Sequence, residues 1–412
     1  MKILMVNKFL YQNGGSETYI FKLGEYLNSI GHKAQYFGME DDRNVVGNHA
    51  ESYTHNVDFH TGKIKKIAYP FKIIYSSTAR KKIRKVLDDF KPDIVHLNNF
   101  NYQITPSVIY EIKEDNIPII FTAHDYQLVC PNHMMYDLNT KNSCEKCLGG
   151  NYLNCYKNRC IHGSKAKSML GTIEANLYKK LKTYRYIDKV ICPSRFMELK
   201  LKCNPNYNGK TVAFHNFIDR VEHKEIEKEN YAIYFGRFSQ EKGMETLVKA
   251  CIEMPDVQFV FAGAGPLENI VNGVPNIKNV GFQKGQALEN YIRKAKFSMY
   301  TSEWYENCPF SVMESQMYRT PVIGANIGGI PELIENHKTG ELYESRNKDD
   351  LKEKIRYLWN NSSIAEEYSK NCETIKFDTV NEYCDKLLEI YQECINKNVK
   401  KKIYSNLFSK LI

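Results

Sequence analysis

One stretch of the sequence decides the fold: Glu303-Trp304-Tyr305-Glu306-Asn307-Cys308-Pro309-Phe310-Ser311-Val312-Met313-Glu314. It follows an apolar run at 297–301 and leads, through a helical pattern, into another apolar run at 321–325. Short, continuous apolar runs are typical of strands that are buried on both faces of a parallel sheet. The stretch is therefore expected to contain the loop that follows one such strand and the start of the next helix.

The same alternation extends outward from this stretch in both directions. Further strands are expected at 3–6, 93–97, 117–123, 189–192, 231–235 and 257–262, with helical patterns between them. A charged, weakly apolar segment interrupts the pattern around 217–230, and a chain of 412 residues fits two domains. We predict an α/β protein of two Rossmann-like, doubly wound parallel-sheet domains that face a central cleft. Their predicted bounds are 1–216 and 217–378, followed by a helix at 379–412 that returns to the first domain.

The charge of the chain is unevenly distributed. Residues 1–218 hold 31 Lys and Arg against 19 Asp and Glu, a net +12, whereas the remainder holds 26 against 29, a net −3. The first half is therefore the part that is expected to face an anionic partner. No signal peptide and no run of ~20 apolar residues is visible, so we expect a cytoplasmic protein.

The densest basic stretch, at 63–91, has the character of a membrane-surface segment. Its lysines alternate with apolar side chains, and the residues concerned are Lys63, Lys65, Lys66, Ile67, Tyr69, Phe71 and Lys72. We expect weak, salt-sensitive attachment to an anionic membrane surface at the inner face of the cell membrane. A solvated helical face is the alternative.

Two glycine turns and a pair of cations are suited to phosphate. The turn Gly14–Gly15 lies between the first strand and the first helix, where a helix N-terminus offers unpaired N–H groups. Arg237 and Lys242 follow the first strand of the second domain and would clamp a pyrophosphate. Gly263 lies in another turn after a strand. An ordinary turn with Ser16 as the helix cap, and solvated cations, remain alternatives.

The two glutamates of the opening stretch, Glu306 and Glu314, carry the remaining chemistry of that loop. A carboxylate accepts two hydrogen bonds, which suits the paired hydroxyls of a sugar or a ribose. A pair of surface glutamates is the alternative.

Several cysteines gather in a glycine- and asparagine-rich insertion at about 130–162. Cys144 and Cys147 have metal-ligand spacing, and Cys155 and Cys160 follow them. The insertion has too little apolar content to order itself by burial. We predict that these four cysteines hold a structural zinc ion, while free core thiols and a redox pair remain alternatives.

Together these motifs resemble the retaining glycosyltransferase family 4, whose fold is GT-B. The resemblance is carried by 301–334 with Gly328-Gly329-Ile330-Pro331-Glu332, by Arg237 with Lys242, by Gly14–Gly15 and by His124-Asp125. It spans residues 1 to about 345, with the motifs in the family's order.

The resemblance implies a role for each residue. Gly15 would donate to the donor phosphate, Arg237 and Lys242 would hold the pyrophosphate, Glu314 the ribose and Glu306 the transferred sugar, with His124 near the reacting carbon. The implied catalytic residues are His124, Arg237, Lys242 and Glu306, and the implied donor-binding residues are Gly14, Gly15, Arg237, Lys242, Gly263, Glu306, Cys308, Phe310, Ser311 and Glu314. Pro309 departs from the glycines common at this loop, and it has no N–H to donate.

We therefore expect a transferase that moves a sugar from a nucleoside diphosphate sugar to a saccharide or lipid-linked acceptor, with retention, in capsule, exopolysaccharide or O-antigen synthesis. No cofactor is expected for catalysis, because cations and helix N-termini can stabilise the leaving diphosphate. The alternatives are a sugar-nucleotide epimerase or another enzyme of the same fold, and a nucleic-acid-binding or regulatory protein. The last would leave the glutamates and cations unexplained, and no nucleic-acid partner is expected.

Overall fold

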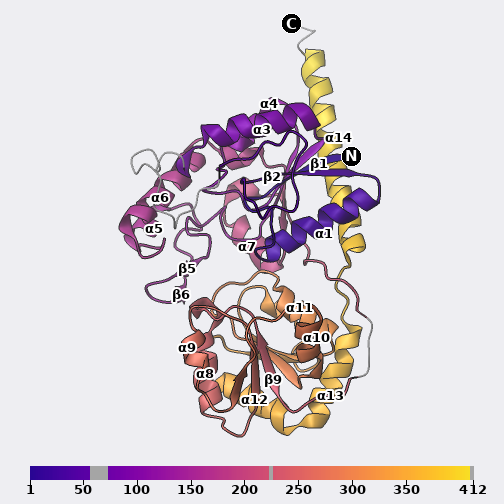
Figure 1. The fold of residues 1–412 in the computed structure, drawn as a ribbon. Coiled ribbons are helices and arrows are strands. Elements are labelled where there is room, and N and C mark those ends of the chain that lie inside the picture. The colour runs from indigo at the N-terminus through magenta and orange to yellow at the C-terminus, as the bar shows by residue number, and fades with distance from the viewer. Residues whose placement is uncertain (56–72, 222–225, 409–412) are drawn as a thin grey trace.

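Two parallel sheets form the centres of two lobes (Figure 1). The computed structural model describes residues 1–55, 73–221 and 226–408. The strand order is β2-β1-β3-β4-β7-β8 in the first sheet and β11-β10-β9-β12-β13-β14 in the second. In each sheet the strands are added on both sides of the first one, which is the doubly wound arrangement. The predicted fold class is confirmed.

The first lobe is built from residues up to Ala213 and is completed by the last helix. Its sheet strands are β1 (Lys2–Val6), β2 (Lys33–Phe37), β3 (Ile94–Leu97), β4 (Ile119–Thr122), β7 (Lys189–Cys192) and β8 (Thr211–Ala213). Its helices are α1 (Gly15–Ser29), α3 (Ser77–Phe90), α4 (Val108–Glu114), α5 (Leu153–Lys157), α6 (Lys165–Lys180) and α7 (Arg195–Lys202).

Helices cover both faces of this sheet because its strands alternate buried side chains between two cores. Leu4 and Val6 of β1 join the core under α3, α4 and α7. Ile3 and Met5 join the opposite core, which α1 and α14 (Val380–Phe408) cover. Strands buried on both sides explain the continuous apolar runs in the sequence.

The second lobe repeats the plan. Its strands are β9 (Ala232–Phe235), β10 (Phe259–Ala262), β11 (Ile277–Asn279), β12 (Phe297–Tyr300), β13 (Val322–Ala325) and β14 (Gly340–Tyr343). Its helices are α8 (Met244–Ile252), α9 (Glu268–Val271), α10 (Gly285–Lys294), α11 (Phe310–Met317), α12 (Lys348–Asn360) and α13 (Ser362–Asn371). One core lies under α8 and α12, and the other lies under α10.

The last helix, α14, packs on the first lobe. Tyr383 shares a hydrogen bond of 2.9 Å between hydroxyl oxygens with Tyr19 of α1, and the Tyr391 hydroxyl lies 2.6 Å from Nδ1 of His96 in β3. The chain thus crosses between the lobes twice, and the crossings touch where the N–H of Ile218 donates to the carbonyl of Asp378 at 2.9 Å. The residues at which one domain ends and the next begins stay a prediction.

The cysteine-rich insertion follows β4 and reaches the second lobe (Figure 1). Its hairpin is formed by β5 (Tyr136–Asp137) and β6 (Asn142–Ser143). Arg346 of the second lobe donates to the side-chain oxygen of Asn142 and to a neighbouring carbonyl in the hairpin. Close by, the Tyr305 hydroxyl donates to Glu145 at 2.7 Å. The insertion therefore bridges the two lobes at one side of the cleft.

The structure covers only part of the predicted membrane segment. Lys63, Lys65, Lys66, Ile67, Tyr69, Phe71 and Lys72 lie outside the described residues. In the described part, Arg80 pairs with Glu111, and Arg84 pairs with Asp88 at 2.7 Å and with Asp115. These two arginines are therefore less available to an anionic surface than the sequence suggested. Within the described residues, no helix combines the length and the apolar character needed to cross a bilayer.

Candidate active site between the two domains

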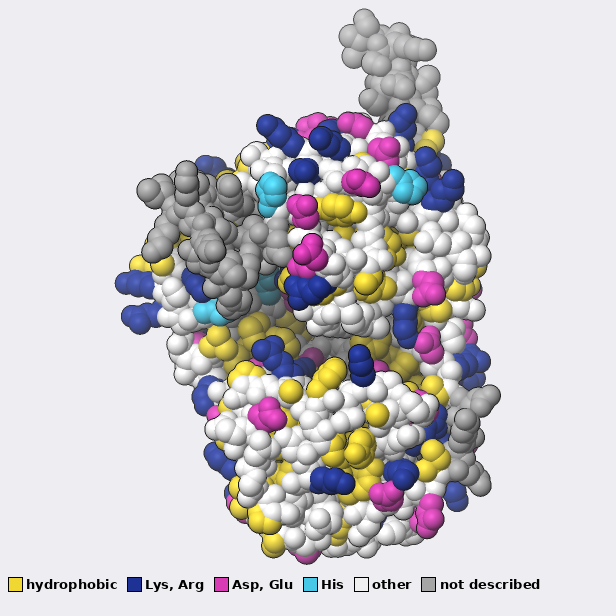
Figure 2. Space-filling model, viewed as in Figure 1, with side chains coloured by type: hydrophobic (Ala, Val, Ile, Leu, Met, Phe, Trp, Pro, Cys, Tyr) yellow, Lys and Arg dark blue, Asp and Glu magenta, His cyan; other side chains and the backbone are white. Residues whose placement is uncertain are grey.

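A cavity of about 380 Å³ lies between the lobes, where the carboxyl ends of both sheets face each other. Figure 2 shows the hollow from outside. Its lining comes from both domains and includes Gly15, Ser16, Asn99, His124, Asp125, Asn216, Lys242, Tyr300, Trp304, Glu306, Cys308, Pro309, Phe310 and Ser311. Open α/β sheets bind their ligands at this edge, so the cavity is the candidate active site.

An ion pair between Lys242 and Glu306 forms the charged centre of the cavity. Lys242 closes a 3₁₀ turn after β9, and Glu306 lies in the loop between β12 and α11. Ser302 donates to the same carboxylate oxygen at 2.8 Å, and the Trp304 indole N–H donates to it as well. The carboxylate is thus held by three donors.

These donors decide the charge state of the pair. Burial alone would raise the pKa of Glu306, but Lys242, Trp304 and Ser302 outweigh burial and lower it. Burial would conversely lower the pKa of Lys242, and the Glu306 carboxylate outweighs this effect and raises it. Both groups are therefore ionised near neutral pH, and the ammonium is directed toward a preformed partner rather than toward solvent.

His124 follows β4 and lies in the cavity wall as a neutral imidazole. Its burial lowers the pKa to about 4, although Asp125 acts in the opposite direction. Nε2 lies 2.9 Å from the side-chain oxygen of Asn98, whose amide nitrogen donates to the carbonyl of His96. Since an amide oxygen can only accept, Nε2 carries the proton and Nδ1 is the acceptor of the ring. The ring also packs edge-on against Tyr19, with centroids 5.0 Å apart.

The turn Gly14–Gly15 lies where the sequence predicts it, at the start of α1. The alternative with Ser16 as the helix cap is wrong: the cap position is Gly14, with no side-chain bond, and Ser16 donates to Glu17 at 3.0 Å. A Cβ on Gly15 would lie 3.4 Å from the ring of Phe310 in the other domain. A Cβ at this distance would be in ordinary van der Waals contact, so the start of α1 lies close to the start of α11.

A carboxylate that the sequence analysis missed shares this turn. Glu17 is only 2% exposed and accepts from the Asn7 amide at 2.8 Å. Its negative charge sits in the first turn of α1, where a helix dipole favours an anion. A donor phosphate at Gly15 would share this helix terminus with Glu17.

The predicted cation clamp is only half assembled. Lys242 lines the cavity, but Arg237 is exposed and does not belong to the lining. Gly263 is buried away from the cavity, in a close crossing of two turns: a Cβ there would come 1.9 Å from the carbonyl oxygen of Gly236. In this structure Gly263 serves the packing between the loops that follow β9 and β10.

The residues after Glu306 form the floor of the cavity. Cys308, Phe310 and Ser311 line it, and Pro309 caps the N-terminus of α11. A proline at this position removes a donor that the first helical turn leaves unpaired in any case. Glu314 lies further along α11, outside the lining. Its burial raises its pKa, and Lys22 of α1 acts in the opposite direction.

The two domains are joined by contacts that no local pattern predicts. Glu332 accepts from the backbone N–H groups of Arg195 and Phe196 at 2.8 and 2.7 Å, at the N-terminus of α7 in the first domain. His215 adds a contact to the same carboxylate at 3.2 Å. The Asn307 amide donates to the carbonyl of His124 at 2.9 Å. Glu332 is the last residue of the motif Gly328-Gly329-Ile330-Pro331-Glu332, to which the sequence alone assigned no role.

The predicted zinc ligands come together, but not as a metal site. Cys144, Cys147, Cys155 and Cys160 border one small cavity of about 10 Å³, together with Cys130. In the part of the chain that the structure describes, no three His, Cys, Asp or Glu side chains are arranged to hold a metal ion. All five are free thiols, and burial raises the pKa of Cys130 and Cys147 to about 12. Zinc stays a prediction without support from this geometry.

Comparison with known families identifies both domains. The family model described as Glycosyltransferase Family 4 matches residues 13–222, about half of the chain, and the model described as Glycosyl transferases group 1 matches 216–374. Both descriptions favour the transferase over the epimerase and over the nucleic-acid-binding or regulatory protein.

Individual relatives are distant. An uncharacterised glycosyltransferase of Methanocaldococcus jannaschii is 27% identical over 51% of this chain and 60% of its own length. The sulfoquinovosyl transferase of Arabidopsis thaliana is 29% identical over 42% of this chain and 34% of its own length. This chain thus covers less than two thirds of the length of either of these two relatives. An uncharacterised protein from the cps region of Klebsiella pneumoniae is 24% identical over 81% of this chain and 87% of that protein.

Solved structures share the fold. The Anabaena protein HepE, in complex with UDP, superposes with a TM-score of 0.66 at 15% identity, covering 98% of this chain and all of that chain. A glycosyltransferase from Rickettsia africae superposes with a TM-score of 0.67 at 18% identity over 96% of this chain and 99% of its own. With two domain families matched in order on this architecture, the chain belongs to the glycosyltransferases of GT-B fold, its first domain to Glycosyltransferase Family 4 and its second to the group 1 glycosyl transferases.

Proposed function

We propose that this chain transfers a sugar from a nucleoside diphosphate sugar, bound mainly by the second domain, to a saccharide or lipid-linked acceptor on the first. The observation that carries the proposal is the Lys242–Glu306 pair in the cavity between the N-termini of α1 and α11. A leaving diphosphate gains negative charge as the glycosidic bond breaks. A fixed ammonium and two helix N-termini stabilise that charge without reorganisation.

In the proposed complex the residues divide the work. Lys242 contacts the diphosphate, and Glu306 accepts hydrogen bonds from the hydroxyls of the sugar while it keeps Lys242 in place. Glu314 binds the ribose, and Arg237 swings onto the diphosphate from its exposed position in the loop after β9. His124 is neutral, so its ring nitrogen Nδ1 accepts a hydrogen bond from a sugar hydroxyl. Retention of configuration and independence from a metal ion enter the proposal from the resemblance to glycosyltransferase family 4.

UDP is the first nucleotide to test, because structures of the GT-B neighbour HepE hold UDP and UDP-glucose. The acceptor side of the proposal draws on two observations. The first half of the chain carries a net +12, which suits an anionic acceptor. The similarity to Klebsiella pneumoniae proteins from the cps region supports a role in polysaccharide synthesis.

The test is a donor screen with a matched pair of variants. Purified protein is incubated with UDP-, GDP-, ADP- and dTDP-sugars in the presence of a chelator, with and without saccharide acceptors. Released nucleotide and glycosylated product are measured, and the anomeric configuration of the product is read by NMR. Lys242→Ala should slow release by about 10²-fold or more, whereas Lys278→Ala, which changes an exposed lysine on β11, should not change it. The proposal would be contradicted if the wild-type protein released no nucleotide from any donor. It would also be contradicted if Lys242→Ala and Lys278→Ala released nucleotide equally fast.

A further inference from the structure

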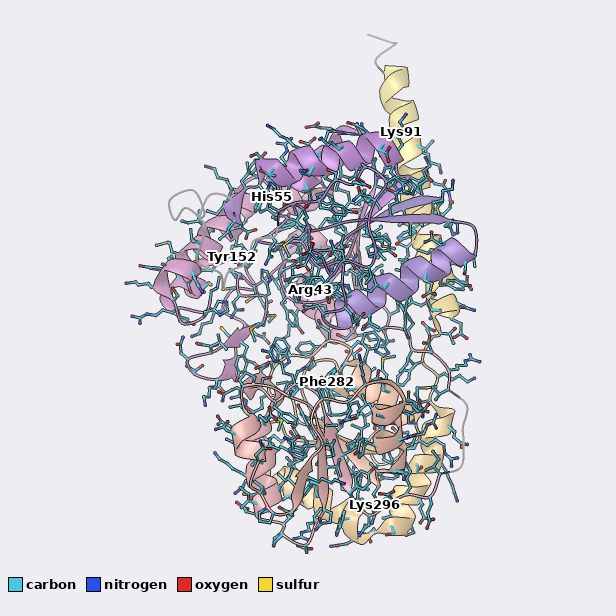
Figure 3. All side chains as sticks on the ribbon, viewed as in Figure 1. Arg43, His55, Lys91, Tyr152, Phe282 and Lys296 are labelled. Carbon is cyan, nitrogen blue, oxygen red and sulfur yellow. The ribbon has the colours of Figure 1, made fainter. Side chains whose placement is uncertain are left out.

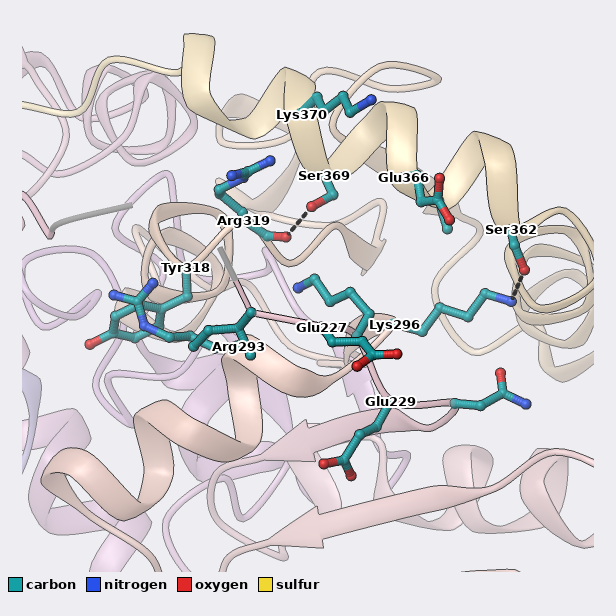
Figure 4. A pocket seen from close by; sticks show the side chains of 14 residues that line it. Glu227, Glu229, Arg293, Lys296, Tyr318, Arg319, Ser362, Glu366, Ser369 and Lys370 are labelled. Carbon is teal, nitrogen blue, oxygen red and sulfur yellow. Dashed lines mark hydrogen bonds between the residues drawn. The ribbon is translucent and has the colours of Figure 1, made fainter. Parts of the chain in front are cut away.

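A second cavity, of about 590 Å³, opens in the second domain away from the cleft (Figure 4). Its walls come from the segment before β9, from α10, from the residues before β12 and β13, and from α13. They include Lys228, Arg293, Lys296, Tyr318, Arg319, Ser369 and Lys370. The cavity thus lies at the amino ends of the strands, opposite the candidate active site. In Figure 3, Lys296 marks this end of the domain and Phe282 marks the end that faces the first domain.

The interior of this cavity is cationic, and its carboxylates lie at the rim. Arg293 is only 5% exposed, and Arg319 and Lys228 are half-buried. Glu227, Glu229 and Glu366 also border the cavity but are exposed. Arg293 has its own partner in Glu289 of α10 at 2.7 Å, and Arg319 pairs with Glu373 at 2.9 Å. The exposed carboxylates at the rim are screened by water, so they compensate Lys228 only weakly.

Lys228 is the least compensated of the interior cations. Its Nζ donates to the Thr320 hydroxyl at 2.9 Å, and that hydroxyl donates in turn to the carbonyl of Ile292 at 2.7 Å. Among the described residues, no carboxylate lies within ion-pair distance of Lys228, so two of its three donors are left for a ligand. Burial is the main cause that lowers its pKa to about 7; Arg319 and Arg293 also lower it, and Cys372 acts in the opposite direction.

Arg319 supplies a second incomplete donor. One of its terminal nitrogens pairs with Glu373 at 2.9 Å, but its Nε is buried and has no partner among the described residues. The backbone of Arg319 is in the left-handed region, with φ of 56°, and Ser369 donates to its carbonyl at 2.7 Å (Figure 4). Such a conformation is unfavourable in a residue other than glycine, so the arginine is held here against a local preference.

We propose that this cavity is a binding site for a phosphate-bearing small molecule, with the phosphate between the Lys228 ammonium and the Arg319 guanidinium. A phosphate offers several acceptor oxygens, which match the two donors of Lys228 that lack partners and the guanidinium of Arg319, whose Nε lacks one. The volume accommodates a phosphate group together with a sugar-sized moiety. The site is separate from the cavity between the domains, so it serves a ligand other than the transferred donor.

Protection of Lys228 from trace acetylation tests the site in the unmodified protein. Acetylation at each lysine is read by peptide mass spectrometry, in inorganic phosphate, in a hexose phosphate, and in sodium chloride of equal ionic strength. With phosphate at about ten times its Kd, labelling of Lys228 should slow by about tenfold, because the bound fraction shields the amine. Lys278 should label at the same rate in all three solutions. A lower concentration of the hexose phosphate for half-protection would identify an organic ligand, and equal concentrations would identify phosphate itself.

Two variants assign the effect to the cavity. Arg319→Asn removes the guanidinium, and asparagine tolerates the left-handed backbone; it should remove the protection of Lys228. Lys228→Met should remove the rise in Tm that phosphate gives to the wild-type protein, whereas Lys278→Met should keep it. Absence of protection at Lys228, or equal protection by chloride, would overturn the proposal. So would a phosphate effect on Tm that Lys242→Met removes and Lys228→Met keeps, because that places the anion in the cleft.

Discussion

Two lysines of the second domain lie at opposite ends of the same sheet, and their surroundings differ. Lys242, at the carboxyl end, is paired with Glu306, and the pair raises its pKa. Lys228, at the amino end, bonds only to a hydroxyl among the described residues, and its pKa falls to about 7. A partly buried ammonium is costly in both places, but only Lys242 has its counter-charge built into the chain. The Lys242 ammonium is therefore neutralised within the protein itself, whereas the Lys228 ammonium requires a ligand to supply its counter-charge.

The largest effect is expected where the built-in pair is broken. Lys242→Ala should reduce turnover by about 10²-fold to 10³-fold, since one preorganised donor to a developing anion contributes that much. It should also lower the free energy of unfolding by about 3–5 kcal/mol, because the Glu306 carboxylate is left buried without its partner. Steady-state kinetics and urea unfolding measure the two effects.

A double variant provides the control for this experiment. Adding Glu306→Gln to Lys242→Ala removes the uncompensated charge and should recover part of the stability but none of the turnover. If Lys242→Ala unfolds at the same urea concentration as the wild-type protein, the pair is not the buried charge centre described here.

Arg237 provides a comparison with Lys242, because it lies in the same loop region but is exposed. Arg237→Ala should reduce turnover by about 10²-fold if the side chain reaches the diphosphate in the complex. The free energy of unfolding should change by less than about 0.5 kcal/mol, as for most exposed side chains. Turnover equal to that of the wild-type protein would remove Arg237 from the proposed clamp.

At Lys228 a substitution is expected to raise the free energy of unfolding, in contrast to the loss expected for Lys242→Ala. Lys228→Met should raise the free energy of unfolding by about 1–3 kcal/mol at pH 6 in phosphate-free buffer, because a charge without a counter-charge leaves the interior. The pKa of Lys228 is about 7 in the folded state and that of an unfolded lysine is near 10.5. Between these values the unfolded chain binds more protons, so the stability of the wild-type protein rises with pH.

The gain of Lys228→Met should therefore be greatest below pH 7 and shrink toward pH 10. Urea unfolding of both proteins at pH 6, 8 and 10 measures the difference. A gain that does not depend on pH would mean that packing, rather than charge, separates the two proteins.

The smallest effect concerns the two glutamates. They differ as the lysines do, because the pKa of Glu306, which is paired with Lys242, is lowered, whereas burial raises the pKa of Glu314. Glu314→Gln should weaken binding of a free nucleoside diphosphate by about tenfold, the value of one lost hydrogen bond to a charged group. Glu306→Gln should change the preference among donor sugars more than the affinity for the nucleotide. Calorimetric titration of UDP and competition between donor sugars measure these quantities, and equal losses of UDP affinity in both variants would contradict the division of roles.

The parts of the fold that the sequence predicted share a physical property. The eight predicted strands are the central strands of the two sheets, whose continuous apolar runs reflect burial on both faces. The strands of these two sheets that were missed, β2, β8, β11 and β14, are all edge strands, and the short hairpin strands β5 and β6 were missed as well. Lys33–Phe37 and Ile277–Asn279 contain polar residues because an edge is partly open to solvent, so no continuous apolar run marks them.

The candidate site divides in a similar way. Residues next to a strand end, such as Lys242, Glu306 and His124, could be located because parallel strands bring their carboxyl ends to one edge. The contacts of Glu332 with the N-terminus of α7 join residues that are more than 130 positions apart in the sequence. No local spacing encodes such a pair, so these contacts appeared only in three dimensions.

The double crossing at Ile218 and Asp378 has a consequence for how the protein is made. The second domain is, in effect, inserted into the first, whose core is completed by Tyr383 and Tyr391 of α14. During synthesis, all strands of the second domain leave the ribosome before α14 does. The second domain can therefore reach its final structure first, while the first domain still lacks the part of its core that α14 covers, around Tyr19 and His96.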